Sequence, residues 1–412
     1  MPLTRRALLS SGAALGLASC ASSRLFSEAR DTRGQRARIT GVELIPVRAT
    51  QRTVWLFARL QTDVGLTGLG EASDAFGYAN TTRAQANEMQ AELQHCAALM
   101  INRSPLESAD YRARGRPRAQ AGGLVAATAY SAIEQALWDL AGKLLERPVH
   151  DLLGGRQRDS LPVYANVNRA AQPRTPAGFA ATAAAAVAEG FRAIKLAPFD
   201  GFQRAQSAHP ESAPAVEAGI ACVAAVREAV GADVELMVDA HSLFDVPLAI
   251  AVAERLAPFR LAWYEEPVAP ELTRETLEIR RRVEQPMAGG ELLFGSEGFA
   301  PLCRERAVDV IMPDVKHCGG IQELLRIAAL AELDGVAVAP HNPSGPVSTA
   351  ASVQACAALP NFRLLELQWG EVPWRRELIA PSESFRAGRI AVPDAPGFGI
   401  ELDLRIARAH PV

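Results

Sequence analysis

From residue 161 onward, short apolar runs alternate with segments rich in alanine, glutamate and arginine that have helical spacing. This alternation is typical of parallel βαβ units. Eight runs follow one another: Leu161–Asn166, Ala193–Leu196, Glu235–Asp239, Leu261–Glu265, Met287–Gly289, Val310–Asp314, Val336–Ala339 and Leu364–Leu367. Eight such units close a (β/α)₈ barrel, whose functional residues follow the carboxyl ends of the strands. The sequence therefore predicts an α/β barrel over residues 156–380.

Carboxylates follow three consecutive predicted strands at equal intervals of 26 residues. Asp239 ends the third strand, Glu265 ends the fourth and Glu291 follows the fifth. Three uncompensated carboxylates at one end of a barrel would repel each other and raise their own pKa values. A divalent cation removes this repulsion, and an all-oxygen ligand set favours Mg²⁺ or Mn²⁺ over zinc. The alternative, three unrelated surface acids, does not account for the equal spacing.

The last three strands continue the series with Asp314, His341 and Glu366. Because Asp314 and His341 end adjacent strands, we expect the carboxylate to orient the imidazole ring and raise its basicity. An oriented imidazole that faces a metal-bound carboxylate is a candidate general base. The sequence therefore predicts His341 as the base.

The pattern alone leaves more than one role open for other polar residues near these strand ends. His241 lies two residues beyond Asp239 and is either a general acid or a supporting loop histidine. Lys195 ends the second strand and is a candidate to neutralise a substrate carboxylate. Lys316 and His317 follow Asp314; we expect a substrate contact for the lysine and a structural role for the histidine.

The chain before the barrel divides into two parts. Thr4-Arg5-Arg6 and the apolar run Ala7–Leu17 predict a twin-arginine export signal, because the run is too short to span a membrane. Cys20 is either lipidated, which would anchor the protein, or an incidental residue of a cleaved signal. We thus expect a periplasmic protein with a signal and linker over 1–36. Strand and helix patterns predict a small α+β unit over 37–155.

Composition excludes several classes of function. The net charge is −3, which gives no indication of nucleic acid or of an anionic membrane surface as a partner. A small anionic substrate remains compatible with this charge. The other five cysteines are scattered without CxxC spacing, which argues against a zinc site and a disulfide framework.

Three motifs resemble the enolase superfamily, and within it the mandelate racemase/muconate-lactonising group. They are Thr62–Ala72 (TDVGLTGLGEA), the segment from Ala136-Leu137-Trp138-Asp139-Leu140 to Gly155, and Pro393–Gly399 (PDAPGFG). The resemblance covers nearly all of the chain after residue 36. It implies a modified (β/α)₈ barrel with an α+β capping domain built from the N-terminal region and the C-terminal segment 381–412.

The resemblance also implies roles for the strand-end residues. Asp239, Glu265 and Glu291 match the magnesium ligands of this family, with Glu266 supporting them. The Asp314–His341 pair matches its Asp–His dyad. Glu366 matches the acid on the last strand that, when protonated, hydrogen-bonds the substrate carboxylate.

One departure from the family pattern indicates which reaction of the superfamily this chain resembles. The second strand ends in Lys195-Leu196-Ala197 and lacks the second lysine of the common Lys-x-Lys motif, while Asp239-Ala240-His241 replaces Asp-x-Asn. This combination resembles the sugar-acid dehydratases of the galactonate and mannonate type. It implies removal of the α-proton by His341, proton donation to the leaving 3-hydroxyl by His241, and a 2-keto-3-deoxy acid as product.

Two other functions remain open at this point. A racemase, epimerase or cycloisomerase of the same superfamily would use Lys316 or His241 on the second face of the substrate. An exported ligand-binding protein would keep the barrel but lack catalysis. By the resemblance, specificity resides in cap loops near 48–54 and 73–80, where Phe76 and Tyr78 either touch the substrate or pack the loop. Relatives commonly assemble, so we expect a homo-oligomer.

Overall fold

The computed structural model describes residues 37–74, 82–203 and 213–412. The predicted export signal, including Cys20, and the predicted loop residues Phe76 and Tyr78 lie outside these described residues. In the part of the chain that the structure describes, no helix combines the length and apolar character that a membrane span requires.

The first part of the described chain is the predicted α+β cap. An antiparallel sheet of order β1-β2-β3 contains Ile39–Arg48, Val54–Thr62 and Thr67–Glu71. The helices that follow are α2 (Arg83–Ala98), α3 (Ser108–Ala121), α4 (Gly123–Leu144) and the short α5 (Val149–Leu152). Helix α4 is buried along most of its length, because its alanine-rich sequence lets it pack closely on the sheet.

Two glycines of β3 permit this close packing. A Cβ atom at Gly68 or Gly70 would collide with the backbone of α4 at Ala136 or Ala132. Only glycine lets two backbones approach this closely. The glycines of the TGLGE segment therefore fix the distance between the cap sheet and the helix that leads into the barrel.

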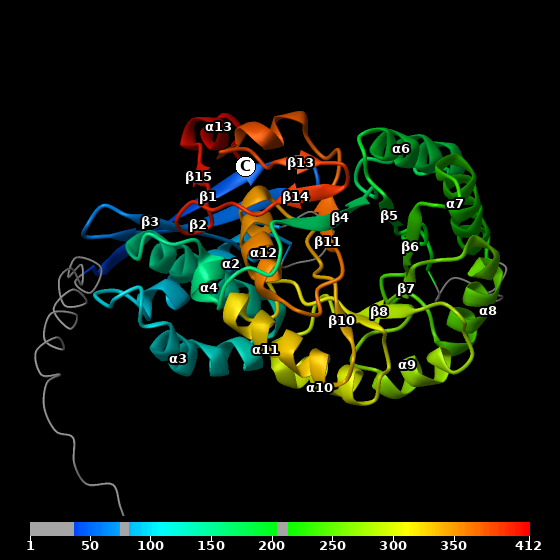
Figure 1. Cartoon of the computed structure of the whole chain (residues 1–412), viewed down its shortest axis with the longest axis horizontal. Helices are drawn as coiled ribbons and strands as arrows, with labels where there is room; N and C mark the ends of the chain where they lie inside the picture. Colours follow the sequence, from blue (N-terminus) through cyan, green and yellow to red (C-terminus); the bar gives the residue numbers. More distant parts are fainter. Residues whose placement is uncertain (1–36, 75–81, 204–212) are drawn as a thin grey trace, which may run out of the picture. The chain divides into compact units, whose positions relative to one another are not determined.

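The barrel contains all eight predicted strands (Figure 1). They are β4 (Ser160–Asn166), β5 (Ala193–Leu196), β6 (Glu235–Asp239), β7 (Trp263–Glu265), β8 (Met287–Gly289), β9 (Val310–Ile311), β10 (Ala337–Val338) and β11 (Leu365–Gln368). Strands β4 to β10 pair in sequence order, all parallel, and β11 pairs with β4. A parallel bridge between Val338 of β10 and Phe362, which lies shortly before β11, closes the barrel. The predicted fold class is thus confirmed.

Helices cover the outside of the strands, as Figure 1 shows for the part formed by α6 to α9. The barrel helices are α6 (Pro176–Ala188), α7 (Pro214–Val230), α8 (Val246–Leu256), α9 (Thr273–Arg280), α10 (Gly295–Arg304), α11 (Gly320–Leu333) and α12 (Pro346–Ala358). Alternate strand residues divide between two cores. Ile194 and Leu236 belong to the large core shared with the helices, whereas Tyr164, Met237 and Trp263 belong to a separate interior cluster. This alternation fills the barrel and leaves its polar residues at the strand ends.

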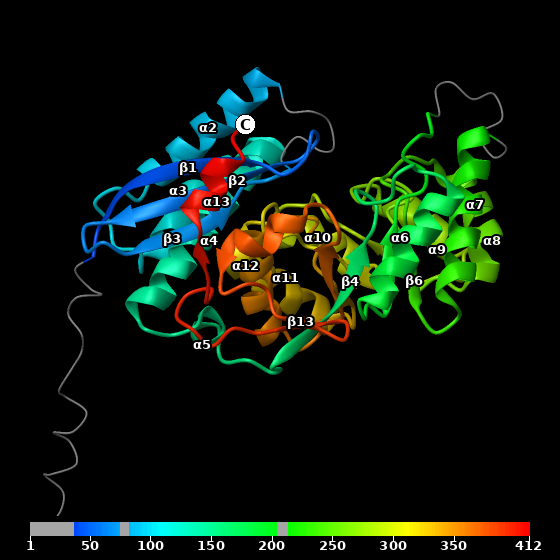
Figure 2. The same cartoon turned by 90° about the horizontal axis from the view of Figure 1, so that it is seen from above.

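The C-terminal segment contacts both the barrel and the cap. A hairpin of β13 (Phe385–Arg386) and β14 (Arg389–Ala391) pairs antiparallel with the start of β4. Further along, the backbone N–H of Phe398 donates to Asp139 on α4. Figure 2 shows the last helix, α13 (Leu404–Ala409), beside β1, where the Arg48 N–H donates to the carbonyl of His410. The early part of this segment therefore lies on the barrel, and its later part on the cap.

Acidic residues of the cap bind the N-termini of two barrel helices. Glu71 accepts hydrogen bonds from the backbone N–H groups of Gly345 (2.7 Å) and Ser348 (2.8 Å) at the start of α12. Glu134 accepts from Ile321 and Gln322 at the start of α11. A carboxylate at a helix N-terminus satisfies unpaired N–H groups and interacts favourably with the helix dipole. The cap thereby holds the loops that follow β9 and β10.

Replacement of Glu71 by alanine is expected to lower the free energy of unfolding by roughly 3 kcal/mol, because two buried N–H groups lose their acceptor. Urea denaturation followed by circular dichroism measures this change. Glu88→Ala, at an exposed position of α2, is the control and should stay within about 0.5 kcal/mol of the unchanged protein. Equal stabilities for the two variants would contradict the role given to Glu71.

Candidate active site

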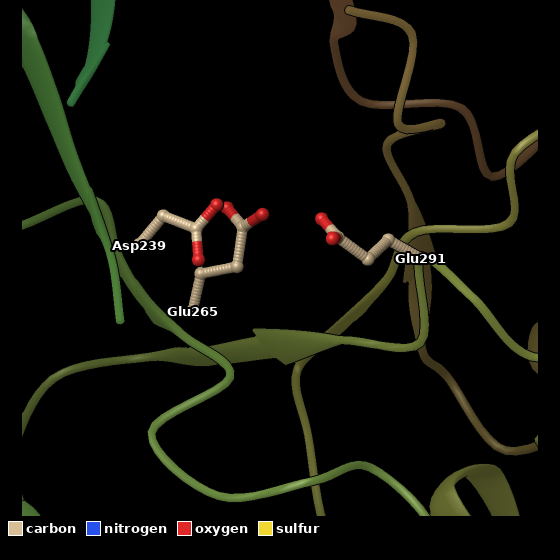
Figure 3. A group of neighbouring side chains, drawn as sticks. All are labelled: Asp239, Glu265 and Glu291. Atoms are coloured by element: carbon tan, nitrogen blue, oxygen red, sulfur yellow. The ribbon is translucent and has the colours of Figure 1, made fainter. Parts of the chain in front are cut away.

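Three carboxylates from consecutive strands meet at the carboxyl end of the barrel (Figure 3). Asp239 and Glu265 are paired residues of the adjacent parallel strands β6 and β7, and Glu291 follows β8. One oxygen of each lies within 4.8 Å of the others, and all three side chains are buried. The structure thus brings together the three acids that were singled out by their spacing.

The electrostatics of this triad favour a cation. Burial, together with repulsion from Asp239, raises the pKa values of Glu265 and Glu291 well above their ordinary range. Asp239 Oδ2 and Glu291 Oε2 are buried, and an imidazole Nε2 lies 3.2 and 3.3 Å from them, respectively. Three buried carboxylates whose oxygens lie this close together suit a divalent ion with oxygen ligands, and Mg²⁺ and Mn²⁺ prefer such ligands. The residues present therefore fit the expected metal.

Lys195 lies among the acids. Its Nζ is 2.7 Å from Glu265 Oε1, 3.1 Å from Glu366 Oε1 and 3.5 Å from Asp239 Oδ2. The side chain is 1% exposed. The ammonium thus compensates protein carboxylates, and its predicted contact with a substrate carboxylate stays a prediction.

His341 and Asp314 form the expected pair. His341 Nδ1 is 2.8 Å from Asp314 Oδ2, and His341 Nε2 is 3.3 Å from Glu291 Oε2. Burial opposes ionisation of Asp314, but Lys316, His317 and His341 together lower its pKa. An ionised Asp314 next to Nδ1 orients the His341 ring and leaves Nε2 directed toward the triad. This is the geometry that a general base requires.

His241 contacts the other side of the triad. Its Nε2 is 3.2 Å from Asp239 Oδ2, and its Nδ1 is 2.6 Å from Asp200 Oδ1. Burial disfavours the charged ring, but the carboxylates of Asp239 and Asp200 outweigh it and raise the pKa of His241 well above its usual value. A protonated imidazole at this position is suited to donate a proton. Sequence reasoning missed Asp200, which lies in the loop after β5.

Glu366 accepts hydrogen bonds through both of its carboxylate oxygens. Its Oε1 accepts from Asn166 Nδ2 (2.7 Å), and its Oε2 accepts from the Asn342 N–H (2.9 Å). Burial raises the pKa of Glu366. The charges of Lys195 and His341 and these two hydrogen bonds outweigh burial, so the pKa of Glu366 is lowered overall. These surroundings favour the ionised form of Glu366, and the protonated form that the resemblance implies stays a prediction.

Lys316 and His317 are both buried behind the dyad. Lys316 Nζ is 3.0 Å from Asp314 Oδ2 and 3.7 Å from Asp74 Oδ2. His317 Nδ1 is 2.8 Å from Thr128 Oγ1, and burial lowers the pKa of its ring to about 3. The neutral, hydrogen-bonded His317 suits the structural role predicted for it, whereas Lys316 contacts the dyad directly.

Replacement of Glu291 by glutamine is expected to weaken Mn²⁺ binding by at least about 100-fold, since even the loss of an outer partner of a metal ligand costs 10- to 100-fold. Calorimetric titration of the metal-free protein measures the affinity. Glu305→Gln, at an exposed position just after α10, is the control for the loss of one acidic side chain. An unchanged affinity of the Glu291 variant would exclude Glu291 as a ligand.

These features define the class of protein: an α/β barrel with a cap, in which a buried carboxylate triad lies between two imidazoles. Residues 38–154 match the mandelate racemase/muconate lactonizing enzyme N-terminal domain, and residues 178–406 match the enolase C-terminal domain-like family. The chain belongs to the mandelate racemase/muconate lactonizing enzyme group of the enolase superfamily.

Individual relatives share most of their length with this chain. It is 30% identical to D-xylonate dehydratase of Haloferax volcanii, over 94% of this chain and 93% of that protein. It is 32% identical to D-galactonate dehydratase of Variovorax paradoxus, over 85% and 89% of the two chains. The crystal structure of a mandelate racemase/muconate lactonizing enzyme from Sulfitobacter sp. superposes with a TM-score of 0.80 at 30% identity, covering 91% of this chain and 96% of that one.

Proposed function

We propose that this protein is a magnesium-dependent dehydratase of a sugar acid, which removes the α-proton and the 3-hydroxyl to give a 2-keto-3-deoxy acid. One observation carries the proposal: two imidazoles approach different members of the triad, His341 at Glu291 and His241 at Asp239. One imidazole is oriented as a base, and the other is favoured in its protonated form. Elimination of water needs one proton acceptor and one proton donor.

The chain's own residues divide the proton transfers between them. A divalent cation on Asp239, Glu265 and Glu291 would attract the substrate carboxylate and spread the negative charge that develops on it. His341 Nε2 takes the α-proton, and ionised Asp314 stabilises the resulting imidazolium.

On the other side, His241 donates its Nε2 proton to the 3-hydroxyl, which leaves as water as the C2–C3 double bond forms. The enol so produced becomes the 2-keto-3-deoxy acid. Lys195 remains between Glu265 and Glu366 and keeps both carboxylates in position.

Dehydration is favoured over racemisation by two further facts. Residue 197 is alanine, so the second lysine that would act on the opposite face is missing. Several relatives that align with most of this chain are named as dehydratases of D-xylonate or D-galactonate.

The test is to incubate the Mg²⁺-loaded protein with a panel of five- and six-carbon aldonic acids and to measure α-keto acid by its semicarbazone. We expect α-keto acid from at least one aldonate, and no α-keto acid after EDTA has removed the metal. Recovery of C2-inverted, deuterium-labelled substrate from D₂O without keto acid would establish a racemase or epimerase instead.

A further inference from the structure

Each carboxylate oxygen of Glu265 accepts a hydrogen bond from a buried side chain. Oε1 accepts from Lys195 Nζ at 2.7 Å, and Oε2 accepts from the indole Nε1–H of Trp263 at 2.8 Å. Lys195 is 1% exposed, and Trp263 and Glu265 are fully buried. Two donors, one on each oxygen, fix the plane of a carboxylate as well as its position.

The strand places the indole directly below this carboxylate. Trp263 and Glu265 are the first and third residues of β7, and alternate residues of a strand point to the same face. Trp263 belongs to the interior cluster of the barrel, together with Tyr164 and Met237. The N–H group therefore reaches Glu265 from the inside of the barrel, in surroundings that exclude bulk water.

Neighbouring side chains hold the indole ring in place. Tyr164 packs edge-to-face against it, with ring centroids 5.6 Å apart, and the guanidinium of Arg363 lies 5.2 Å from its centroid. An indole N–H only donates, so its role does not change with pH. The ammonium of Lys195, in contrast, is shared among Glu265, Asp239 and Glu366. Trp263 is thus the donor that acts on Glu265 with a fixed direction.

We propose that Trp263 is a positioning residue of the metal site, which holds Glu265 in an orientation that favours Mg²⁺ or Mn²⁺ over Ca²⁺. The inference rests on the metal site of the proposed function. Mg²⁺ requires a nearly ideal octahedral set of oxygens, whereas Ca²⁺ accepts flexible sets and carboxylates that bind through both oxygens. A carboxylate whose plane is fixed therefore suits the smaller ion. Hydrogen-bond partners that orient metal ligands commonly contribute 10- to 100-fold to metal affinity.

Two variants separate the donor from the packing of the ring. Trp263→Phe removes the N–H and part of the ring volume. Benzothienylalanine in place of Trp263, introduced at a stop codon, replaces the N–H by sulfur and keeps the shape of the ring. Trp369→Phe is the matched control, because it removes an indole N–H that donates to Glu189 Oε2 at 2.9 Å, a pair outside the triad and the dyad. Thermal unfolding of the metal-free proteins verifies that each variant is folded.

Metal affinity is the readout, so turnover is not needed. Calorimetry measures Mn²⁺ binding, and displacement of Mn²⁺, followed by electron paramagnetic resonance of the free ion, gives the affinities for Mg²⁺ and Ca²⁺. We expect the affinities for Mn²⁺ and Mg²⁺ to fall by roughly 10- to 100-fold in both Trp263 variants. The affinity for Ca²⁺ should change by only about two- to threefold, because Ca²⁺ tolerates a less ordered carboxylate. The control should keep all three affinities.

Unchanged Mn²⁺ affinity in both variants would overturn the inference, and so would an equal loss for all three ions, which a packing role would give. A loss in Trp263→Phe without a loss in the benzothienylalanine protein would also overturn it. If Trp263→Phe does not fold, the benzothienylalanine protein decides alone.

The proposed function fails in a different way. If the unchanged protein forms no keto acid, yet its preference for Mn²⁺ and Mg²⁺ over Ca²⁺ depends on the indole N–H, the dehydration is refuted and the role of Trp263 stands. If the unchanged protein binds no Mn²⁺, both the metal site and the role of Trp263 are refuted.

Discussion

Replacement of His341 by asparagine is expected to reduce kcat for keto acid formation by on the order of 10⁴-fold, the upper end of what a general base contributes. Asparagine has a similar size and can still hydrogen-bond to Asp314, but it cannot accept the α-proton. The triad is unchanged, so Mn²⁺ affinity should stay within a few-fold. Exchange of the C2 proton with D₂O, followed by NMR, should be lost together with turnover.

The control for this variant is His95→Asn, at an exposed position of α2. It should turn over like the unchanged protein. Retained keto acid formation in the His341 variant, with normal metal content, would exclude His341 as the base. A loss of metal binding in parallel would instead assign His341 to the metal site.

Replacement of His241 by asparagine is expected to reduce keto acid formation by on the order of 10³-fold while C2 proton exchange continues. The two reactions separate because His341 and Asp314 still remove and return the α-proton, whereas the 3-hydroxyl has lost its proton donor. NMR in D₂O detects deuterium in recovered substrate and keto acid in the same sample.

The outcome of this experiment distinguishes the role of His241 as acid from the role of His341 as base. Simultaneous loss of exchange and elimination would show that His241 is needed for the first step, which contradicts its assignment as the acid. Undiminished elimination would leave the leaving hydroxyl without an identified donor.

An Asp200→Asn variant should show a weaker form of the same phenotype, because Asp200 only orients the His241 ring and supports its charge.

Much of the fold was predictable because barrel strands are short apolar runs that recur once per βα unit. Six of the eight predicted strands lie within one residue of the observed bounds at both ends: those that start at Leu161, Ala193, Glu235, Met287, Val336 and Leu364. The run predicted to end at Asp314 forms a strand only at Val310–Ile311. Met312 still donates to the Gly289 carbonyl of β8, and Asp314 lies in the loop, where it accepts from the Lys316 N–H.

The triad and the dyad were predictable for the same reason, since a residue at the end of a parallel strand has its position set by the strand. Contacts between loops have no such regularity. Asp200 contacts His241, which is 41 residues away in the sequence, and Arg169 contacts Asp74, which is 95 residues away. The contacts of Glu366 with Lys195 on β5 and with Asn166 on β4 likewise join side chains of different strands, so neither periodicity nor motif could predict them.

We propose that carboxylates of three adjacent strands share one divalent ion opposite the His341 imidazole. Anomalous X-ray scattering from crystals soaked in Mn²⁺ locates this ion. We expect one strong peak about 2.1 Å from an oxygen of each of Asp239, Glu265 and Glu291, with His341 Nε2 directed toward the same cavity. Mn²⁺ bound elsewhere, or a triad without the ion at saturating concentration, would contradict it.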